Sequence, residues 1–147
     1  MDAAVLDANV LVPGFVNAQG VAGRIVTAWQ SALFELVTSE HIIGETGRAL
    51  RDPYYLRRIS ETQIQAALLL LRRRATVTEL TVLVRGVATH PEDDLVLSAA
   101  LSAPARYLVT RDKRLQEIRS HEGILIVPPP AFLQILGATG DGTRPET

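Results

Sequence analysis

Short apolar runs alternate along the chain with segments whose apolar side chains recur every three or four residues. The apolar runs predict strands, and the helically spaced segments predict helices. Strands are predicted for the run that ends at residue 6 and for residues 34–38, 76–83, 105–110 and 124–127, and helices for residues 21–34, 40–50, 61–74, 91–101, 111–119 and 131–136. Because parallel strands need crossover connections, this order predicts a parallel sheet between two layers of helices.

Several boundaries have their own signals. Ser39 and Ser60 are expected helix N-caps, and Pro91 suits a first helical turn, where its missing N–H is harmless. Pro13-Gly14 and the polar residues 17–20 predict a loop after the first strand. The leucine run 68–71 points apolar side chains around the whole helix axis, which predicts burial on more than one side, by the core, a partner protein or both.

Composition limits the size and the chemistry of the molecule. The chain has 147 residues, of which 47% are hydrophobic and 21% charged, so we expect one domain over residues 1–136. Residues 137–147 are rich in Gly, Thr and Asp, and we expect a disordered tail there. No leader or membrane-spanning stretch is evident, so we expect a cytoplasmic protein. The net charge of -1 argues against a broad basic surface but not against a local basic rim.

Five acidic residues are candidates for a metal site. Asp7 follows the first strand, Asp112 follows the strand that ends at Thr110, and Glu45 flanks the apolar stripe of its helix. The carboxyl ends of parallel strands share one sheet edge, so most of these groups are expected to converge. Asp93 and Asp94 open a later helix, and Asp93 lies on its apolar side, where an unpaired charge is costly.

Each acid also has an ordinary structural explanation. Asp7 is a plausible turn residue, Glu45 a surface glutamate, Asp93 or Asp94 a helix-dipole partner, and Asp112 a helix cap. As a set, however, they would repel one another, since two carboxylates 4 Å apart repel by about 4 kcal/mol at an effective dielectric of 20. A divalent cation removes that repulsion. Because the chain has no cysteine, oxygen ligands or the three histidines must hold the cation, which indicates a hard metal.

The ordered acidic pattern resembles the PIN-domain nucleases, and among them most closely the VapC-like toxins of bacterial toxin-antitoxin pairs. It covers nearly the whole chain up to about Leu136. Two departures are His90, where similar members often carry Asp, and Arg111, where they often carry Gly. The resemblance rests on Asp7-Ala8-Asn9, Ser39 with Glu45, Pro91-Glu92-Asp93-Asp94, and Val109-Thr110-Arg111-Asp112 with Leu115.

This resemblance implies a three-layer α/β/α sandwich with a central parallel sheet, cleavage of RNA with Mg2+ or Mn2+, and frequent homodimers. It also implies an antitoxin protein as a partner. Carried onto this chain, it implies a metal and catalytic role for four acids and leaves open whether Asp93 or Asp94 is the direct ligand. The four acids are Asp7, Glu45, Asp93 and Asp112, and the polar residues expected to support them are Asn9, Ser39 and Thr110.

The ligands and their neighbours suggest a mechanism and a substrate contact. A divalent ion that activates a water molecule would cleave phosphodiesters to leave a 5'-phosphate and a 3'-hydroxyl. Arg111, Lys113 and Arg114 surround Asp112 and are expected to hold RNA phosphates, whereas Arg72–Arg74 are expected only to complement a helix C-terminus.

Two rival functions stay open. One is a phosphatase of the haloacid dehalogenase kind, which usually needs a second Asp where this chain has Asn9. The other is a catalytically inactive PIN-like module that binds RNA or protein.

Overall fold

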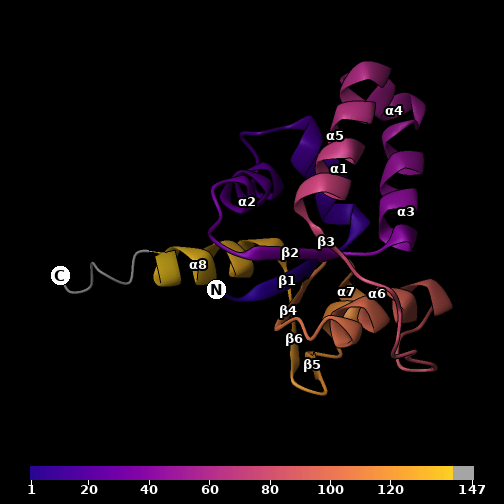
Figure 1. Ribbon diagram of the computed structural model, residues 1–147, viewed down its shortest axis with the longest axis vertical. Helices are drawn as coiled ribbons and strands as arrows, with labels where there is room; N and C mark the ends of the chain where they lie inside the picture. The colour runs from indigo at the N-terminus through magenta and orange to yellow at the C-terminus, as the bar shows by residue number, and fades with distance from the viewer. Residues whose placement is uncertain (141–147) are drawn as a thin grey trace.

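A six-stranded sheet forms the centre of the computed structural model, which describes residues 1–140 (Figure 1). The strand order is β3-β2-β1-β4-β6-β5, and every neighbouring pair is parallel except β5 with β6. The strands are β1 Ala3–Leu6, β2 Glu35–Thr38, β3 Thr76–Val77, β4 Tyr107–Val109, β5 Ser120–His121 and β6 Ile124–Val127. The predicted central parallel sheet is therefore confirmed.

Helices cover both faces of this sheet. Figure 1 shows α1, α2, α3 and α5 on one side and α6 and α7 on the other, which is the layered arrangement expected of an α/β/α sandwich. The helix α8 packs against α2, and its Phe132 ring meets Phe34 and Tyr107 edge to face. The helices are α1 Ala8–Val16, α2 Val21–Gln30, α3 Glu40–Leu50, α4 Pro53–Leu56, α5 Glu61–Arg74, α6 Pro91–Ser102, α7 Lys113–Gln116 and α8 Pro129–Gly140.

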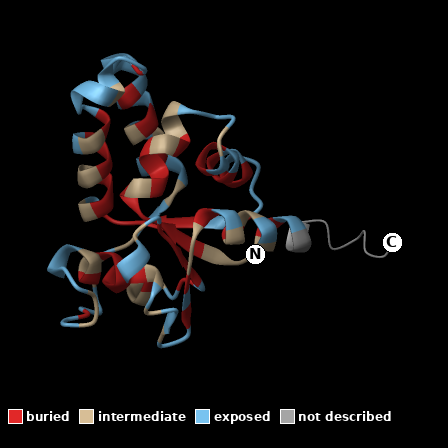
Figure 2. Ribbon diagram, turned by 180° about the vertical axis from the view of Figure 1, so that it is seen from behind, coloured by how far each residue is buried: buried red, intermediate tan, exposed pale blue. Residues whose placement is uncertain are grey.

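The core follows from the apolar runs. Val5 and Leu6 of β1 and Leu108 and Val109 of β4 are fully buried, and the strands and inward helix faces are red in Figure 2. Burying one such side chain stabilises the fold by about 1.5–3 kcal/mol. Parallel strands covered on both faces lose the alternation of polar and apolar residues, which explains why these runs are continuous.

Helix α1 replaces the loop that was predicted at Pro13-Gly14. Asp7 caps this helix, and Pro13 lies inside it. A Cβ atom on Gly14 would lie 2.6 Å from Val26 Cγ2, so Gly14 permits close contact between α1 and α2. The Pro-Gly pair therefore serves helix packing rather than a turn, and the prediction was wrong at this pair, whereas residues 17–20 form the predicted connection between α1 and α2.

Several other boundaries differ from the prediction. The strand predicted at 76–83 is only β3, because residues from 78 onward form an irregular loop before α6. The helix predicted at 111–119 shortens to α7, and the chain then forms the unpredicted strand β5. A tight turn joins β5 to β6, with positive φ at Glu122 (49°) and Gly123 (88°), as two-residue hairpin loops require.

The end of the chain differs in part from the expected disordered tail. Helix α8 continues to Gly140, so residues 137–140 are helical rather than disordered. The remainder of that expectation, residues 141–147, lies outside the described residues. Within residues 1–140, no helix combines the length and apolar character needed to span a membrane.

Candidate active site

Asp7 is buried at the carboxyl end of β1, the strand that lies between β2 and β4. Its backbone N–H donates to the Val109 carbonyl of β4 at 3.0 Å. Its side chain is the N-cap of α1, where Oδ1 accepts a hydrogen bond from the Ala8 N–H at 2.8 Å. The strand and the helix together fix the position of this carboxylate.

Thr110, the first residue after β4, holds the second oxygen of Asp7. Its hydroxyl donates to Asp7 Oδ2 at 2.9 Å and accepts from the Asn9 amide at 3.2 Å. The Asn9 Oδ1 atom accepts from the Arg111 N–H at 3.0 Å. Asn9 and Thr110, the residues expected to support the acids, thus tie the segments that follow β1 and β4 to each other.

Asp112 belongs to the same network. Its backbone N–H donates to the Thr110 hydroxyl at 3.1 Å, and its Oδ1 accepts from the N–H groups of Arg114 and Leu115 at the start of α7. Among the described residues, no hydrogen bond reaches its Oδ2 atom. Asp112 is therefore a helix cap with one free carboxylate oxygen, so its structural role leaves room for a ligand.

Glu45 lies on α3 with 27% of its side chain exposed. The His41 Nε2 atom is 3.6 Å from Glu45 Oε1, which is longer than a hydrogen bond but close enough for an ion pair when the imidazole is protonated. Ser39, expected as a support, is the N-cap of α3, where its hydroxyl accepts from the Ile42 N–H at 3.3 Å. Its observed contact orients the helix that carries Glu45.

Asp93 and Asp94 have different surroundings. Asp94 is buried, and its two oxygens accept the backbone N–H groups of Gly86, Val87 and Ala88 at 2.7–3.2 Å. Its carboxylate thus holds the loop before α6. Asp93 is half-buried, and none of the described residues forms a hydrogen bond to its carboxylate. The free carboxylate of this pair is therefore Asp93.

The pKa shifts show that four of the acids influence one another. Burial raises the pKa of Asp7 to about 6 despite the hydrogen bonds from Thr110 and Ala8, and the negative charges of Asp93 and Glu45 raise it further. Burial also raises the pKa of Asp93, followed by the charges of Asp112 and Glu45. Asp7, Glu45, Asp93 and Asp112 thus form one electrostatic cluster, which we call the acidic cluster.

The acidic cluster fits a hard cation by its chemistry. Its members are all carboxylates, the ligands that Mg2+ and Mn2+ prefer, and a cation would offset both the burial and the smaller repulsion that raise the pKa values of Asp7 and Asp93. Among the described residues, no three His, Asp or Glu side chains converge closely enough to enclose an ion by themselves. This spacing is compatible with Mg2+, which keeps several water ligands and takes only one or two carboxylates directly.

Basic side chains border the acidic cluster on the α7 side. Arg111, Lys113 and Arg114, expected to hold phosphates, are exposed, and none forms an ion pair within the described residues. By contrast, Arg72 pairs with Glu40 at 2.6 Å, and Arg74 donates to the Gln30 carbonyl. Arg72 and Arg74 of α5 thus have structural partners, whereas the cations near Asp112 remain available to a ligand.

Comparison with known proteins identifies the family. The model of the PIN domain matches residues 3–114, which include all four members of the acidic cluster. The chain belongs to the PIN-domain family. PIN domains are generally nucleases, so the family supports a nuclease-like role for this chain. No curated protein matches it.

One solved structure has the same fold as this PIN domain. The crystal structure of PAE2754 from Pyrobaculum aerophilum superposes with a TM-score of 0.66, over 93% of this chain and 90% of that one. The two sequences are 22% identical, so the likeness concerns the fold alone.

Two residues of the PIN-domain site escaped the sequence analysis. Gln116 of α7 donates from Nε2 to the Thr110 carbonyl at 2.7 Å, which braces the residue that holds Asp7. No sequence pattern predicts this contact, because it depends on how α7 is placed relative to Thr110 in the folded chain. His41 precedes Glu45 by four residues, and that helical spacing alone could have marked it as a neighbour.

Proposed function

We propose that this PIN domain is a divalent-metal-dependent endoribonuclease. The observation that carries the proposal is the buried Asp7, whose pKa is raised to about 6 although Thr110 and Ala8 both donate hydrogen bonds to it. A cation that binds beside a buried carboxylate stabilises its charged form and so stabilises the folded protein. Family membership supports a hydrolytic use of that site.

The acidic cluster and the polar residues beside it would have different roles in this reaction. Asp7, Glu45, Asp93 and Asp112 would hold Mg2+ or Mn2+, directly or through water. Thr110 and Asn9 keep the Asp7 carboxylate in one orientation, since each donates to a site oxygen. A bound divalent ion would make a water molecule more acidic and would neutralise charge on the phosphodiester.

RNA is the proposed substrate because free cations lie beside the acids. Arg111, Lys113 and Arg114 would hold the phosphates of the strand on the α7 side of the cluster. None of the buried side chains among the described residues belongs to a histidine or a lysine. Water is the proposed attacking group. We expect a 5'-phosphate and a 3'-hydroxyl on the products.

Cleavage of a mixed pool of labelled structured and single-stranded RNAs tests this function. We expect cleavage with Mn2+ or Mg2+ and its loss both with a chelator and in Asp7→Asn. The control variant is Arg73→Ala, which removes an exposed charge on α5, away from the acidic cluster, and should cleave like the wild type. Products that end in a cyclic phosphate would contradict hydrolysis by water.

A catalytically inactive module is the alternative outcome of the same experiment. Such a module would bind the RNA pool with and without metal and cleave none of it. Asp7→Asn would then leave RNA binding unchanged, and the four acids would have to be explained by structure alone.

We also propose the toxin of a type II toxin-antitoxin pair as the biological role, working as a homodimer that an antitoxin protein inhibits. The likeness of the acidic pattern to VapC-like toxins supports this role. Induced expression of the wild type in a bacterial host should arrest growth, whereas Asp7→Asn, expressed to the same level, should not. Light scattering of the purified protein tests the dimer.

A further inference from the structure

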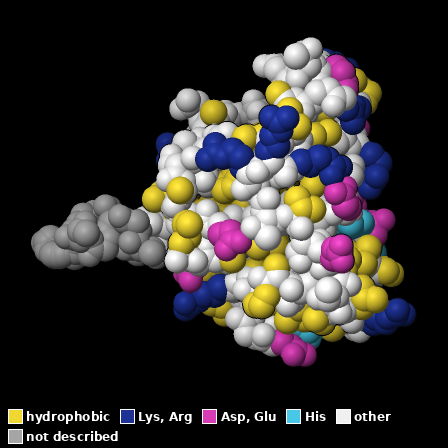
Figure 3. Space-filling model, in the orientation of Figure 1, with side chains coloured by type: hydrophobic (Ala, Val, Ile, Leu, Met, Phe, Trp, Pro, Cys, Tyr) yellow, Lys and Arg dark blue, Asp and Glu magenta, His cyan; other side chains and the backbone are white. Residues whose placement is uncertain are grey.

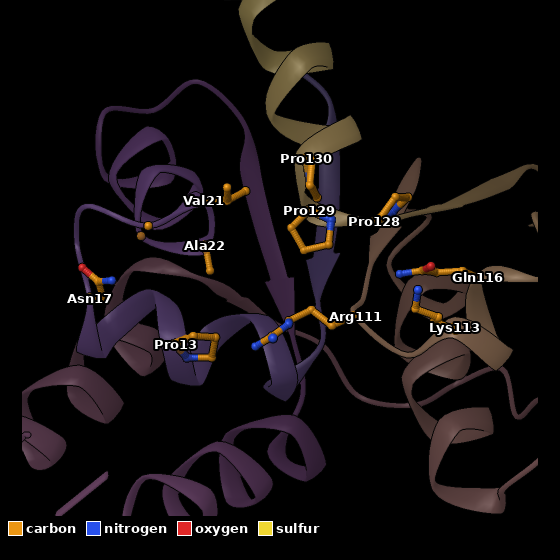
Figure 4. Close-up of a pocket in the computed structure, with 12 residues that line it drawn as sticks. Pro13, Asn17, Val21, Ala22, Arg111, Lys113, Gln116, Pro128, Pro129 and Pro130 are labelled. Atoms are coloured by element: carbon orange, nitrogen blue, oxygen red, sulfur yellow. The ribbon is translucent and has the colours of Figure 1, made fainter. Parts of the chain in front are cut away.

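A hollow of about 530 Å3 lies next to the acidic cluster, between the start of α2, the start of α8 and α7 (Figure 4). Its volume is within the range of about 300–1,000 Å3 that is typical of small-molecule sites. Two contacts connect it to the site: the Arg111 backbone bonds to Asn9, and the Gln116 side chain bonds to Thr110. A ligand in this hollow would therefore lie beside the residues that position Asp7.

The charge of the hollow is entirely positive. Arg111 and Lys113 line it, and Figure 4 shows the Arg111 side chain extending across the hollow toward Pro13. None of the twelve lining residues is acidic. Neither cation forms an ion pair within the part of the chain that the structure describes. The hollow thus offers two unneutralised cations to an anionic ligand.

Apolar residues line two facing sides of the hollow. Pro128, Pro129 and Pro130 form one side, and Val21 and Ala22 of α2 face them across the hollow in Figure 4. Proline rings present flat apolar faces and lose little conformational entropy when a ligand packs on them. Gln116 projects between the apolar and charged walls, where its Nε2 donates to the Thr110 carbonyl and its Oε1 accepts no hydrogen bond from the described residues.

A ligand that contacts both the two cations and the prolines would carry a phosphate at one end and a flat, partly apolar group with hydrogen-bond donors at the other. A nucleotide has this composition, whereas a free phosphate would leave the proline wall without a partner. We propose that this hollow, which we call the proline pocket, binds one nucleotide of the RNA strand next to the scissile phosphate. In it, Arg111 and Lys113 hold the phosphate, and the base packs on the proline wall.

This assignment rests on the proposed ribonuclease function, but its test requires neither metal nor cleavage. The four nucleoside 5'-monophosphates are titrated separately into 15N-labelled protein in a chelating buffer, and amide chemical shifts are recorded. The matched ligands are the corresponding nucleosides and inorganic phosphate. We expect shifts at the Gln116 side-chain amide and at the backbone amides of Val21 and Ala22, which line the proline pocket.

The variants Arg111→Ala and Lys113→Ala should each weaken nucleotide binding by about tenfold, since each removes one charge-assisted contact. Arg73→Ala should leave the affinity within about twofold, because Arg73 is an exposed cation of α5 that does not line the pocket. The amide spectrum of each free variant establishes that it is folded.

Two results would overturn the assignment. One is the absence of shifts at the proline pocket with millimolar nucleotide, and the other is inorganic phosphate binding as tightly as the nucleotide. Failure here would leave the acidic cluster and its cleavage assay untouched. Conversely, nucleotide binding by a protein that cleaves no RNA would contradict the ribonuclease function and not the pocket.

Discussion

Two adjacent carboxylates on α6 are surrounded so differently that one substitution should affect catalysis and the other stability. Asp94 accepts three backbone N–H groups of residues 86–88, and its neighbour Ser98 accepts the Val84 N–H. This side of α6 therefore holds the loop before the helix. Asp93 instead responds to the charges of Asp112 and Glu45. The structure thus gives Asp94 a structural role and leaves the Asp93 carboxylate without a hydrogen bond from the described residues.

We expect Asp93→Asn to reduce RNA cleavage by at least about 100-fold with little change in stability, because it removes a charge from the acidic cluster. Asp94→Asn should lower the free energy of unfolding by about 1–3 kcal/mol, since one amide oxygen replaces two carboxylate oxygens and leaves a partly buried backbone N–H without an acceptor. Urea unfolding and single-turnover cleavage measure the two effects. The reverse pattern would show that Asp94 is the ligand.

The pKa of Asp7 predicts how stability depends on pH in a metal-free buffer. Burial raises this pKa from 3.8 to about 6 in the folded protein, so between these values the folded state binds more protons than the unfolded state. The resulting stabilisation is fully present below pH 3.8 and is lost as the pH rises through 6. Relative to Asp7→Asn, the wild type should lose about 2 kcal/mol between pH 4 and pH 7.

Urea unfolding of both proteins in a chelating buffer at several pH values measures this difference. Other carboxylates titrate in both proteins, so the comparison isolates Asp7. A difference between the two proteins that stays constant with pH would mean that the Asp7 carboxylate is solvated in solution.

At the residue scale, the sequence predicts contacts between residues that follow the ends of neighbouring strands. Asp7 and Thr110 follow apolar runs that are also neighbouring strands, so their contact follows from the parallel order. The apolar face of the helix predicts that Asp93 is buried, and this prediction is wrong, because Asp94 is the buried residue of the pair and Asp93 is only half-buried. The Asp93 carboxylate nevertheless accepts no hydrogen bond from the described residues. The role of Asp94 was inaccessible, because its partners lie in a loop that the sequence analysis took for part of a strand and a connection.

At the scale of elements, α1 and α2 show why the sequence analysis failed near Pro13. Local propensity favours a turn at Pro-Gly, but tertiary packing decides here. Gly14 faces Val26, and Gly23 faces the backbone of Asn17 and Ala18, so the two glycines bring the helices and their connection together. The same contact places the start of α2 beside the proline pocket. No periodicity in a single sequence reports such a close approach.

Gly23→Ala should therefore be strongly destabilising. A Cβ atom there would lie 2.1 Å from the Asn17 carbonyl oxygen, so the backbone would have to move, at a cost of about 1–3 kcal/mol or more. Gly44→Ala is the matched control in α3, where the nearest atom is the end of the Arg48 side chain at 3.4 Å. This control should be neutral or up to about 1 kcal/mol more stable, because alanine favours helix.

Thermal or urea unfolding of the two glycine variants provides the measurement. Equal stability of Gly23→Ala and the wild type would show that Gly23 of α2 lies further from the connection at Asn17 and Ala18 in solution than in the structure.

At the scale of the whole molecule, charge is distributed so that attraction for RNA must be local. The net charge is -1, and on the face drawn in Figure 3 most Lys and Arg side chains lie in the upper half, with α2, α3 and α5. On α5 and at the end of α3, two cations already have partners, in the pairs Arg72–Glu40 and Arg51–Glu61. The cations beside Asp112 form no ion pair within the described residues and lie next to the acidic cluster, so we expect them to attract a polyanion.

The salt dependence of RNA binding tests this distribution. In an Asp7→Asn background, which should bind without cleaving, the affinity for a short single-stranded RNA is measured by anisotropy at increasing salt. Each cation that neutralises a phosphate contributes about 0.7 to the slope of log affinity against log salt. Adding Lys113→Ala should lower the slope by that amount, whereas Arg73→Ala should not change it. If Arg73→Ala instead lowers the slope and Lys113→Ala does not, the RNA runs over α5 rather than beside the acidic cluster.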